Sequence, residues 1–172
     1  MYKVSFTDNF KKVERFNNKV TKVTLEGIIN NAYNQSSISI PTPVFEWMVD
    51  NIGSHINTIK MTGTAIRNDN DKDDPVLGER LAEARAKLKI YKFMKTFCNK
   101  MLKYYKFKLY GTKANNEIIV KTSPEGLSNN DSLLKAYMKY DKLVDVENNY
   151  IKQLLYNDLL NNESNTKSSQ KH

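Results

Sequence analysis

The chain has 172 residues, 40% of them hydrophobic, and a formal net charge of +8 at neutral pH. This length allows one buried core and is short for two of ordinary size, so a single domain over residues 1–160 is expected. No apolar run reaches the roughly 18 residues of a membrane span, and the N-terminus lacks a signal-peptide pattern, so no membrane partner is expected. The single cysteine, Cys98, excludes an internal disulfide and a zinc site built from several cysteines. These features favour a cytoplasmic protein.

Strands are predicted in the N-terminal third, where hydrophobic and polar residues alternate. Residues 20–26 show this period of two, and residues 3–6 and 37–40 are shorter candidates. Residues 58–66 alternate again, because Ile59, Met61 and Ala65 are separated by even numbers of positions and so share one face of a strand. With a helix before this last strand, the stretch could pair in parallel, and the pattern leaves the order of the strands open.

The first helix is predicted from its end signals. Thr42 followed by Pro43 is typical of an N-cap with proline at the first helical position. The helix is expected to run from Pro43 to about Ile52 and to end at Gly53.

A second, longer helix begins where the charge of the sequence changes sign. Residues 68–79 carry five carboxylates against one lysine, whereas residues 80–108 carry ten basic residues against Glu83 alone. Asp74 before Pro75 predicts an N-cap, and acidic residues there complement the positive end of the helix dipole. We expect this helix to run from Pro75 to about Tyr105 and to be the central core helix.

The faces of this helix follow from the spacing of its residues. Apolar residues recur at intervals of three, four and seven on a stripe that widens in the second half, and Lys95 interrupts it or extends outward from it. The remaining arc carries basic residues and is predicted to face solvent as a basic ridge. This ridge consists of Arg85, Lys89, Lys92, Lys100, Lys103 and, near its edge, Lys106.

The C-terminal part is predicted to hold a hairpin, two helices and a tail. Residues 106–110 alternate between lysine and apolar residues, residues 111–116 are typical of a turn, and residues 117–121 form an apolar-centred run, which together indicate a hairpin. Helices are expected over residues 132–140 and 144–160, and a disordered polar tail over residues 161–172. The predicted class is therefore α+β, with a small mixed or antiparallel sheet packed on a long central helix and with C-terminal helices.

Metal and catalytic sites are not supported by the motifs. Asp69, Asp71 and Asp73 have the alternate spacing of a calcium loop, but Asp74 and Arg80 occupy the positions that need glycine and glutamate. A solvated acidic turn that caps the helix is the preferred interpretation of these carboxylates. We therefore expect no metal site.

The candidate nucleophiles also lack the partners that catalysis needs. Ser54 and His55 are neighbours in a turn without a nucleophile motif, and Cys98 lies on the apolar stripe, where a structural thiol is favoured. The glycines are isolated, so no phosphate-binding loop is present. We expect no catalytic residue, no cofactor and no enzymatic activity.

Basic and aromatic residues interleave at the end of the long helix. The segment from Lys103 to Tyr110 has the composition of a single-strand binding platform, with lysines for phosphates and with Tyr104 and Tyr110 as stacking rings. An amphipathic helix end that runs into a strand gives the same composition, and this alternative stays open.

The stretch around the start of the long helix resembles a known group of proteins. Gly63-Thr64-Ala65-Ile66-Arg67, the acidic run 71–74, Gly78 and the segment 81–86 are similar to a pattern in small, largely uncharacterised proteins of phages that infect low-GC bacteria. There a strand leads through an acidic turn and a glycine into an alanine-rich basic helix. The resemblance covers about a quarter of the chain and implies a phage source, without any catalytic residue.

Two binding functions are consistent with these patterns. The first is a phage accessory protein that binds single-stranded DNA, duplex DNA or RNA through the basic ridge. The alternative is a protein-binding factor that inhibits or adapts a host or phage machine, because an acidic loop beside a basic helix also suits an electrostatically steered protein partner. In either case the protein is expected in the host cytoplasm.

Overall fold

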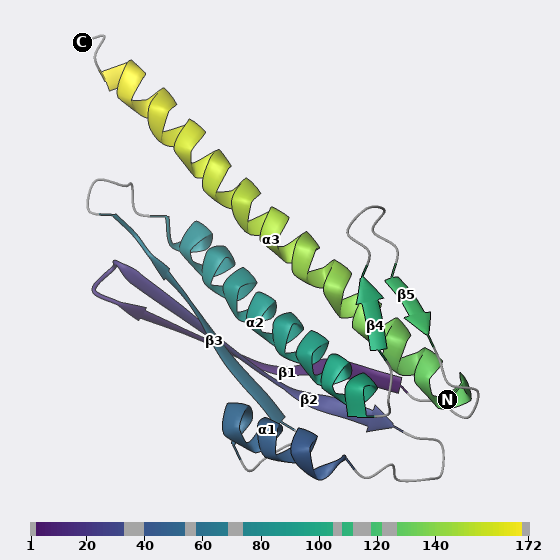
Figure 1. Ribbon diagram of the computed structural model, residues 1–172. Coiled ribbons are helices and arrows are strands. Elements are labelled where there is room, and N and C mark those ends of the chain that lie inside the picture. Colours follow the sequence, from purple (N-terminus) through teal and green to yellow (C-terminus); the bar gives the residue numbers. More distant parts are fainter. Residues whose placement is uncertain are drawn as a thin grey trace. The chain divides into compact units, whose positions relative to one another are not determined.

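The computed structural model describes residues 3–32, 40–53, 58–68, 74–104, 108–111, 118–121 and 127–169 (Figure 1). Strands β1, β2 and β3 form one sheet in that order, and β4 and β5 form a second, two-stranded sheet. The elements in chain order are β1 (Lys3–Phe16), β2 (Val20–Ala32), α1 (Thr42–Ile52), β3 (Thr58–Ile66), α2 (Pro75–Tyr104), β4 (Lys108–Gly111), β5 (Ile118–Lys121) and α3 (Leu127–Ser169). The predicted α+β class with a long helix is confirmed.

The three-stranded sheet is antiparallel. The Arg67 amide, just after β3, donates a hydrogen bond of 2.8 Å to the Lys19 carbonyl, just before β2. Further along, the Thr24 and Thr62 hydroxyls share a hydrogen bond of 2.9 Å. Residue numbers therefore rise in β3 as they fall in β2, and the parallel pairing that the pattern left open is not the one the chain adopts.

Strand β1 continues ten residues beyond Phe6, where the predicted strand ends, and leads into a tight turn. Asn17 and Asn18 both have positive φ angles, of 49° and 53°, and the Lys19 amide donates to the Phe16 carbonyl. Asparagine accepts this left-handed conformation more readily than most residues, which suits a hairpin turn. The residues from Thr7 to Phe16 are exposed or half-exposed, so this edge strand shows little of the hydrophobic alternation by which strands are recognised.

The helix ends agree with the predictions at most positions. The Leu77 amide donates to Asp74 Oδ1 at 2.9 Å, which confirms the N-cap of α2. Helix α1 ends at Gly53, with φ of 82°, as predicted. Its N-cap is Pro41, however, so the prediction of Thr42 as the cap was wrong: Thr42 is already helical.

The C-terminal elements partly match the predictions. Strands β4 and β5 pair antiparallel, with Tyr110 opposite Ile119, which confirms the hairpin. Helix α3 is continuous where two helices were predicted, because residues 141–143 contain neither glycine nor proline to end it. Helix α3 also runs on from Asn161 to Ser169, into the segment predicted as a disordered tail. Of the strand predicted at residues 37–40, residues 37–39 lie outside the described residues, and Ile40 is not part of a strand.

The chain divides into two compact units, which are described separately. The first unit comprises residues 1–7, 27–59 and 92–141. In it, the second half of α2 buries Phe97, Cys98 and Met101 completely. The Trp47 ring of α1 stacks on Phe93 with a centroid distance of 4.8 Å. This packing confirms the predicted apolar stripe in that half of the helix, although Tyr104 is 53% exposed.

The second unit comprises residues 8–26, 60–91 and 142–172. Here the first half of α2 packs on the sheet, and Val23, Leu25 and Ala82 are buried. Contact between β3 and α2 is at backbone distance, because Gly63 lies directly against the α2 backbone. Leu88, predicted as a core residue, is only half-buried. The prediction of a single domain over residues 1–160 stays a prediction.

Candidate functional site

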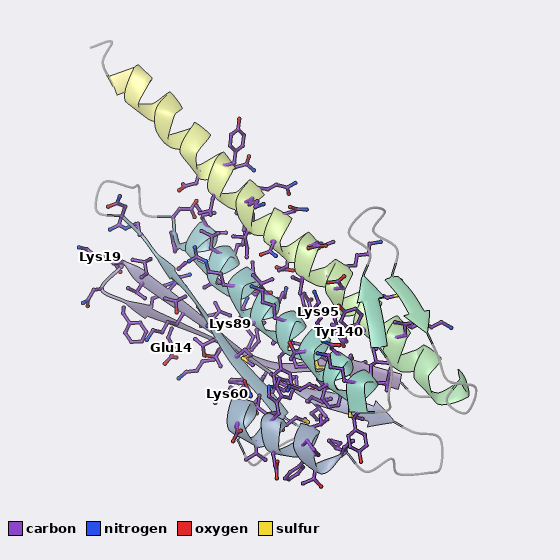
Figure 2. All side chains as sticks on the ribbon, in the orientation of Figure 1. Glu14, Lys19, Lys60, Lys89, Lys95 and Tyr140 are labelled. Carbon is purple, nitrogen blue, oxygen red and sulfur yellow. The ribbon has the colours of Figure 1, made fainter. Side chains whose placement is uncertain are left out.

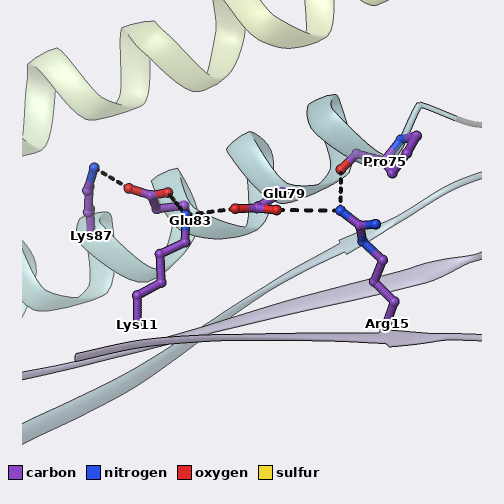
Figure 3. A network of polar contacts seen from close by, with 6 residues as sticks. All are labelled: Lys11, Arg15, Pro75, Glu79, Glu83 and Lys87. Carbon is purple, nitrogen blue, oxygen red and sulfur yellow. Dashed lines mark hydrogen bonds and ion pairs between the residues drawn. The ribbon is translucent and has the colours of Figure 1, made fainter.

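The carboxylates of α2 lie on the side of the helix that faces β1 (Figure 3). Lys11 Nζ lies 2.8 Å from Glu79 and 2.6 Å from Glu83. Lys87 Nζ, one helical turn further on, lies 2.6 Å from the other oxygen of Glu83. Burial would raise the pKa of Glu83, but the hydrogen bonds from Lys11 and Lys87 outweigh burial and lower it. Both acidic residues of α2 are thus neutralised locally, away from the predicted basic ridge.

Two residues of the basic ridge form hydrogen bonds to backbone carbonyls at the edge of the sheet. Arg85 Nη1 donates to the Thr64 carbonyl and Lys89 Nζ donates to the Thr62 carbonyl, both at 2.6 Å. Figure 2 shows Lys89 between α2 and β3. Among the described strands β3 is an edge strand, so its outward carbonyls face no neighbouring strand of that set. Part of the hydrogen-bonding capacity of Arg85 and Lys89 is therefore committed within the protein.

Three described residues of the ridge, Lys92, Lys100 and Lys103, lie in the first unit. Lys92 and Lys103 are exposed. Lys100 is half-buried, with Nζ 5.2 Å from the centroid of the Trp47 ring, a cation–π contact. Among the described residues, Lys92, Lys100 and Lys103 form no ion pair. We call these three residues the lysine line; at about 1.5 Å per helical residue it is roughly 16 Å long.

Lys95, which the sequence placed on the apolar stripe, is held by α3. Its Nζ forms an ion pair with Asp141 and lies 5.8 Å from the centroid of the Tyr137 ring. The stripe is therefore interrupted by a charge that is neutralised in place, and Lys95 is not part of the lysine line.

The remaining candidate residues fall into two groups, those outside the described part of the chain and those that the structure places. The side chains of Lys106 and Tyr110, together with Ser54, His55 and the aspartates 69, 71 and 73, lie outside the described residues. Cys98 is fully buried, as its place on the apolar stripe predicted, and burial raises the pKa of its thiol to about 12. No group of three or more potential metal ligands occurs in the part of the chain that the structure describes. Within those residues no helix has the length and apolar character needed to cross a bilayer.

The second unit contains a cavity that the sequence did not predict. A cavity of about 230 Å³ lies at the turn after β1, the end of β3, the start of α2 and one side of α3. It is lined by Arg15, Lys19, Arg67 and Arg85, among others. Only four of the 27 basic residues are arginines, and this scarcity could have marked them as candidate functional residues. Their distances in sequence, however, did not indicate that they lie close together in the fold.

Comparison with known proteins identifies no relative: the chain matches no family model, and no curated protein or solved structure is significantly similar to it.

Proposed function

We propose that the protein binds nucleic acid without catalysing a reaction, and that the lysine line on α2 supplies the main phosphate contacts. The observation that supports this proposal is that Lys92 and Lys103 are exposed on one face of the helix and have no carboxylate partner among the described residues. Cations without internal partners are available to replace the counterions of a phosphate backbone. With the resemblance to phage proteins, this function suits an accessory protein in the host cytoplasm.

An exposed ring next to the lysine line supports a preference for single strands. Tyr104 follows Lys103 directly, and half of its surface is accessible to solvent. Aromatic rings beside cations bind single strands by base stacking, which a duplex does not permit. Tyr110, at the end of the same basic segment, is proposed as a second ring. Arg85 and Lys89 are proposed as weaker contributors, because each already donates to a β3 carbonyl.

The experiment that tests this proposal measures binding to single-stranded DNA, duplex DNA and RNA of equal length across a salt series. The variant K92E/K103E should lose affinity for all three. The slope of log K against log salt should become shallower by about 1.4 to 1.8, the value for two phosphate contacts. The control K142E/K152E makes the same change of net charge at two exposed lysines of α3. If both variants weaken binding equally, or the wild type shows no salt-sensitive binding, the proposal fails.

A protein partner is the second candidate, and exposed apolar residues of α3 favour it. Val146 and Tyr150 lie one helical turn apart and are 52% and 40% exposed, and Tyr156 is 61% exposed. Exposed apolar residues that share a helix face, as Val146 and Tyr150 do, are typical of protein contacts. A purified partner bound through this face should lose affinity with Tyr150→Asp and keep it with K92E/K103E. The reverse result would exclude this alternative.

A further inference from the structure

The arginines of the chain are concentrated around one cavity. Lysine outnumbers arginine by 23 to four, since four of the 27 basic residues are arginines. Arg15, Arg67 and Arg85 nevertheless all line the cavity of about 230 Å³ in the second unit, although they come from β1, the end of β3 and α2. Arginine differs from lysine in that its planar, permanently charged guanidinium binds oxyanions through two parallel hydrogen bonds. The cavity thus collects the side chains best suited to hold such an anion.

The charge of the lining is positive overall. Lys19 joins the three arginines, and Asp74 and Asp158 are the carboxylates of the lining, so four cations meet two anions. Asp74 is already engaged, because its Oδ1 accepts the Leu77 amide at the start of α2. Lys19, Arg67 and Asp158 also interact with other groups of the protein. The formal charge of the lining, four cations less two anions, is +2, which matches a dianion better than a monoanion.

Arg15 is the most adaptable of these cations. Its Nη2 lies 3.4 Å from both the Pro75 carbonyl and Glu79 Oε2 (Figure 3), distances at which hydrogen bonds are weak. Its side chain is 48% exposed. Arg15 can therefore turn toward a bound anion at little cost, whereas Arg85 is held by a short hydrogen bond to the Thr64 carbonyl.

Part of the cavity lining is apolar. Leu77 and Leu81 of α2, Ile66 of β3 and Leu155 of α3 line it. A dry cavity of about 150 Å³ in another protein accepts benzene, and drug-sized ligands occupy about 300 Å³ or more. The volume therefore suits a ligand that has one ring and one anionic group.

We propose that this cavity binds a small organic phosphate, with the phosphate at the arginines and the apolar body against the leucines. Arg15 and Arg67 hold the phosphate oxygens, and Leu155 covers the ring. A phosphate monoester carries a charge of about −1.5 to −2 at neutral pH, which the lining complements, whereas a carboxylate carries only one charge. The cavity shares no residue with the lysine line, so this inference does not depend on the proposed binding of nucleic acid.

Calorimetric titration of the full-length protein with phenyl phosphate, inorganic phosphate, benzoate and phenol tests the ligand class. Phenyl phosphate should bind saturably and more tightly than inorganic phosphate, which lacks the apolar body, and than benzoate, which lacks the second charge. Phenol should show no binding. Absence of saturable binding by phenyl phosphate, or tighter binding of benzoate, would overturn the proposal.

Two variants with a matched control locate the site. Arg15→Met should weaken phenyl phosphate binding at least tenfold, the loss expected for a charge-assisted hydrogen bond. Arg80→Met is the control, because Arg80 is the arginine outside the cavity lining and is exposed. Leu155→Trp, at a position 40% exposed in the wild type, should block the cavity and abolish binding without unfolding the protein. Equal losses in R15M and R80M, or unchanged binding in R15M or L155W, would place the ligand elsewhere and overturn the proposal.

Discussion

Gly63 of β3 lies so close to Ala82 of α2 that a methyl group on Gly63 would overlap the Ala82 carbonyl oxygen. Replacing a strand glycine by alanine normally stabilises a protein by about 0.4–1 kcal/mol, because the unfolded chain loses freedom. Here the overlap involves helix backbone, which cannot rotate away, so we expect Gly63→Ala to lower the free energy of unfolding by about 2 kcal/mol or more. Urea denaturation measures this change.

Gly53 supplies the matched control for that substitution. Gly53 follows the last residue of α1, and its φ is 82°. Apart from its chain neighbours, no atom of the described residues lies within 4 Å of the position that a Cβ would take. Gly53→Ala should therefore cost only the strain of a left-handed residue, about 1–2 kcal/mol. A Gly63→Ala variant as stable as the wild type would mean that α2 and β3 do not pack at backbone distance.

Most of the fold could be predicted wherever the sequence has a strong period or a clear end signal. Helix α2 carries its apolar stripe over eight turns and begins at a capping aspartate, and β3 was predicted with the bounds it has. The extension of β1 could not be predicted, because Lys11 and Arg15 form ion pairs with α2 where a buried strand would place apolar residues. Hydrophobic periodicity in a sequence reflects which side chains are buried. An edge strand that is held in place by ion pairs buries few side chains, so it lacks this periodicity.

The candidate site was predictable in composition and not in geometry. Helical spacing placed Lys92 and Lys103 on one exposed face, as the structure has them. That Arg85 and Lys89 hydrogen-bond to β3 depends on which strand is the sheet edge, and the sequence left the strand order open. The arginine-lined cavity depends likewise on contacts between segments more than 50 residues apart, such as Arg15 and Arg67, which no local pattern encodes.

Tyr140 makes a buried hydrogen bond that can be removed without changing the shape of the core. Its side chain is 2% exposed, and its hydroxyl accepts the Phe6 amide at 2.9 Å. Tyr140→Phe leaves that amide without this acceptor, so we expect a loss of about 1–3 kcal/mol in the free energy of unfolding. Tyr156→Phe, at a ring 61% exposed, is the control and should change stability by less than about 0.5 kcal/mol. Equal effects would show that the Phe6 contact contributes nothing to stability.

The two halves of the apolar stripe on α2 should respond differently to truncation. Leu102 is 1% exposed, whereas Leu88 is half-buried. Leu102→Ala should therefore cost about 2–5 kcal/mol, the range for a buried leucine, and Leu88→Ala less than about 2 kcal/mol. The denaturation midpoints of the two variants check this order, provided that the free energy of unfolding depends on denaturant concentration with the same slope in both. A larger loss for Leu88→Ala would contradict the burial of the two side chains.

Cys98 should be unreactive in the folded protein. The thiol is fully buried on α2, and burial raises its pKa from an ordinary value of 9.0 to about 12. Because the thiolate is the reactive form, Ellman's reagent at pH 8 should label Cys98 only as fast as the protein opens, and quickly in urea. Rapid labelling of the native protein would show that the thiol is accessible.

The same burial makes stability depend on pH, with a sign that follows from the two pKa values. In the unfolded chain the thiol loses its proton above about pH 9, whereas in the folded protein it keeps the proton up to about pH 12. The unfolded state then binds fewer protons, so the free energy of unfolding falls as pH rises through this window. Lysines and tyrosines titrate there too, but they are common to the wild type and Cys98→Ala. The wild type should therefore lose unfolding free energy relative to Cys98→Ala as the pH rises from 8.5 to 10.5, roughly within the window that the two pKa values set. A difference that stays constant would mean that the thiol has the same pKa in both states.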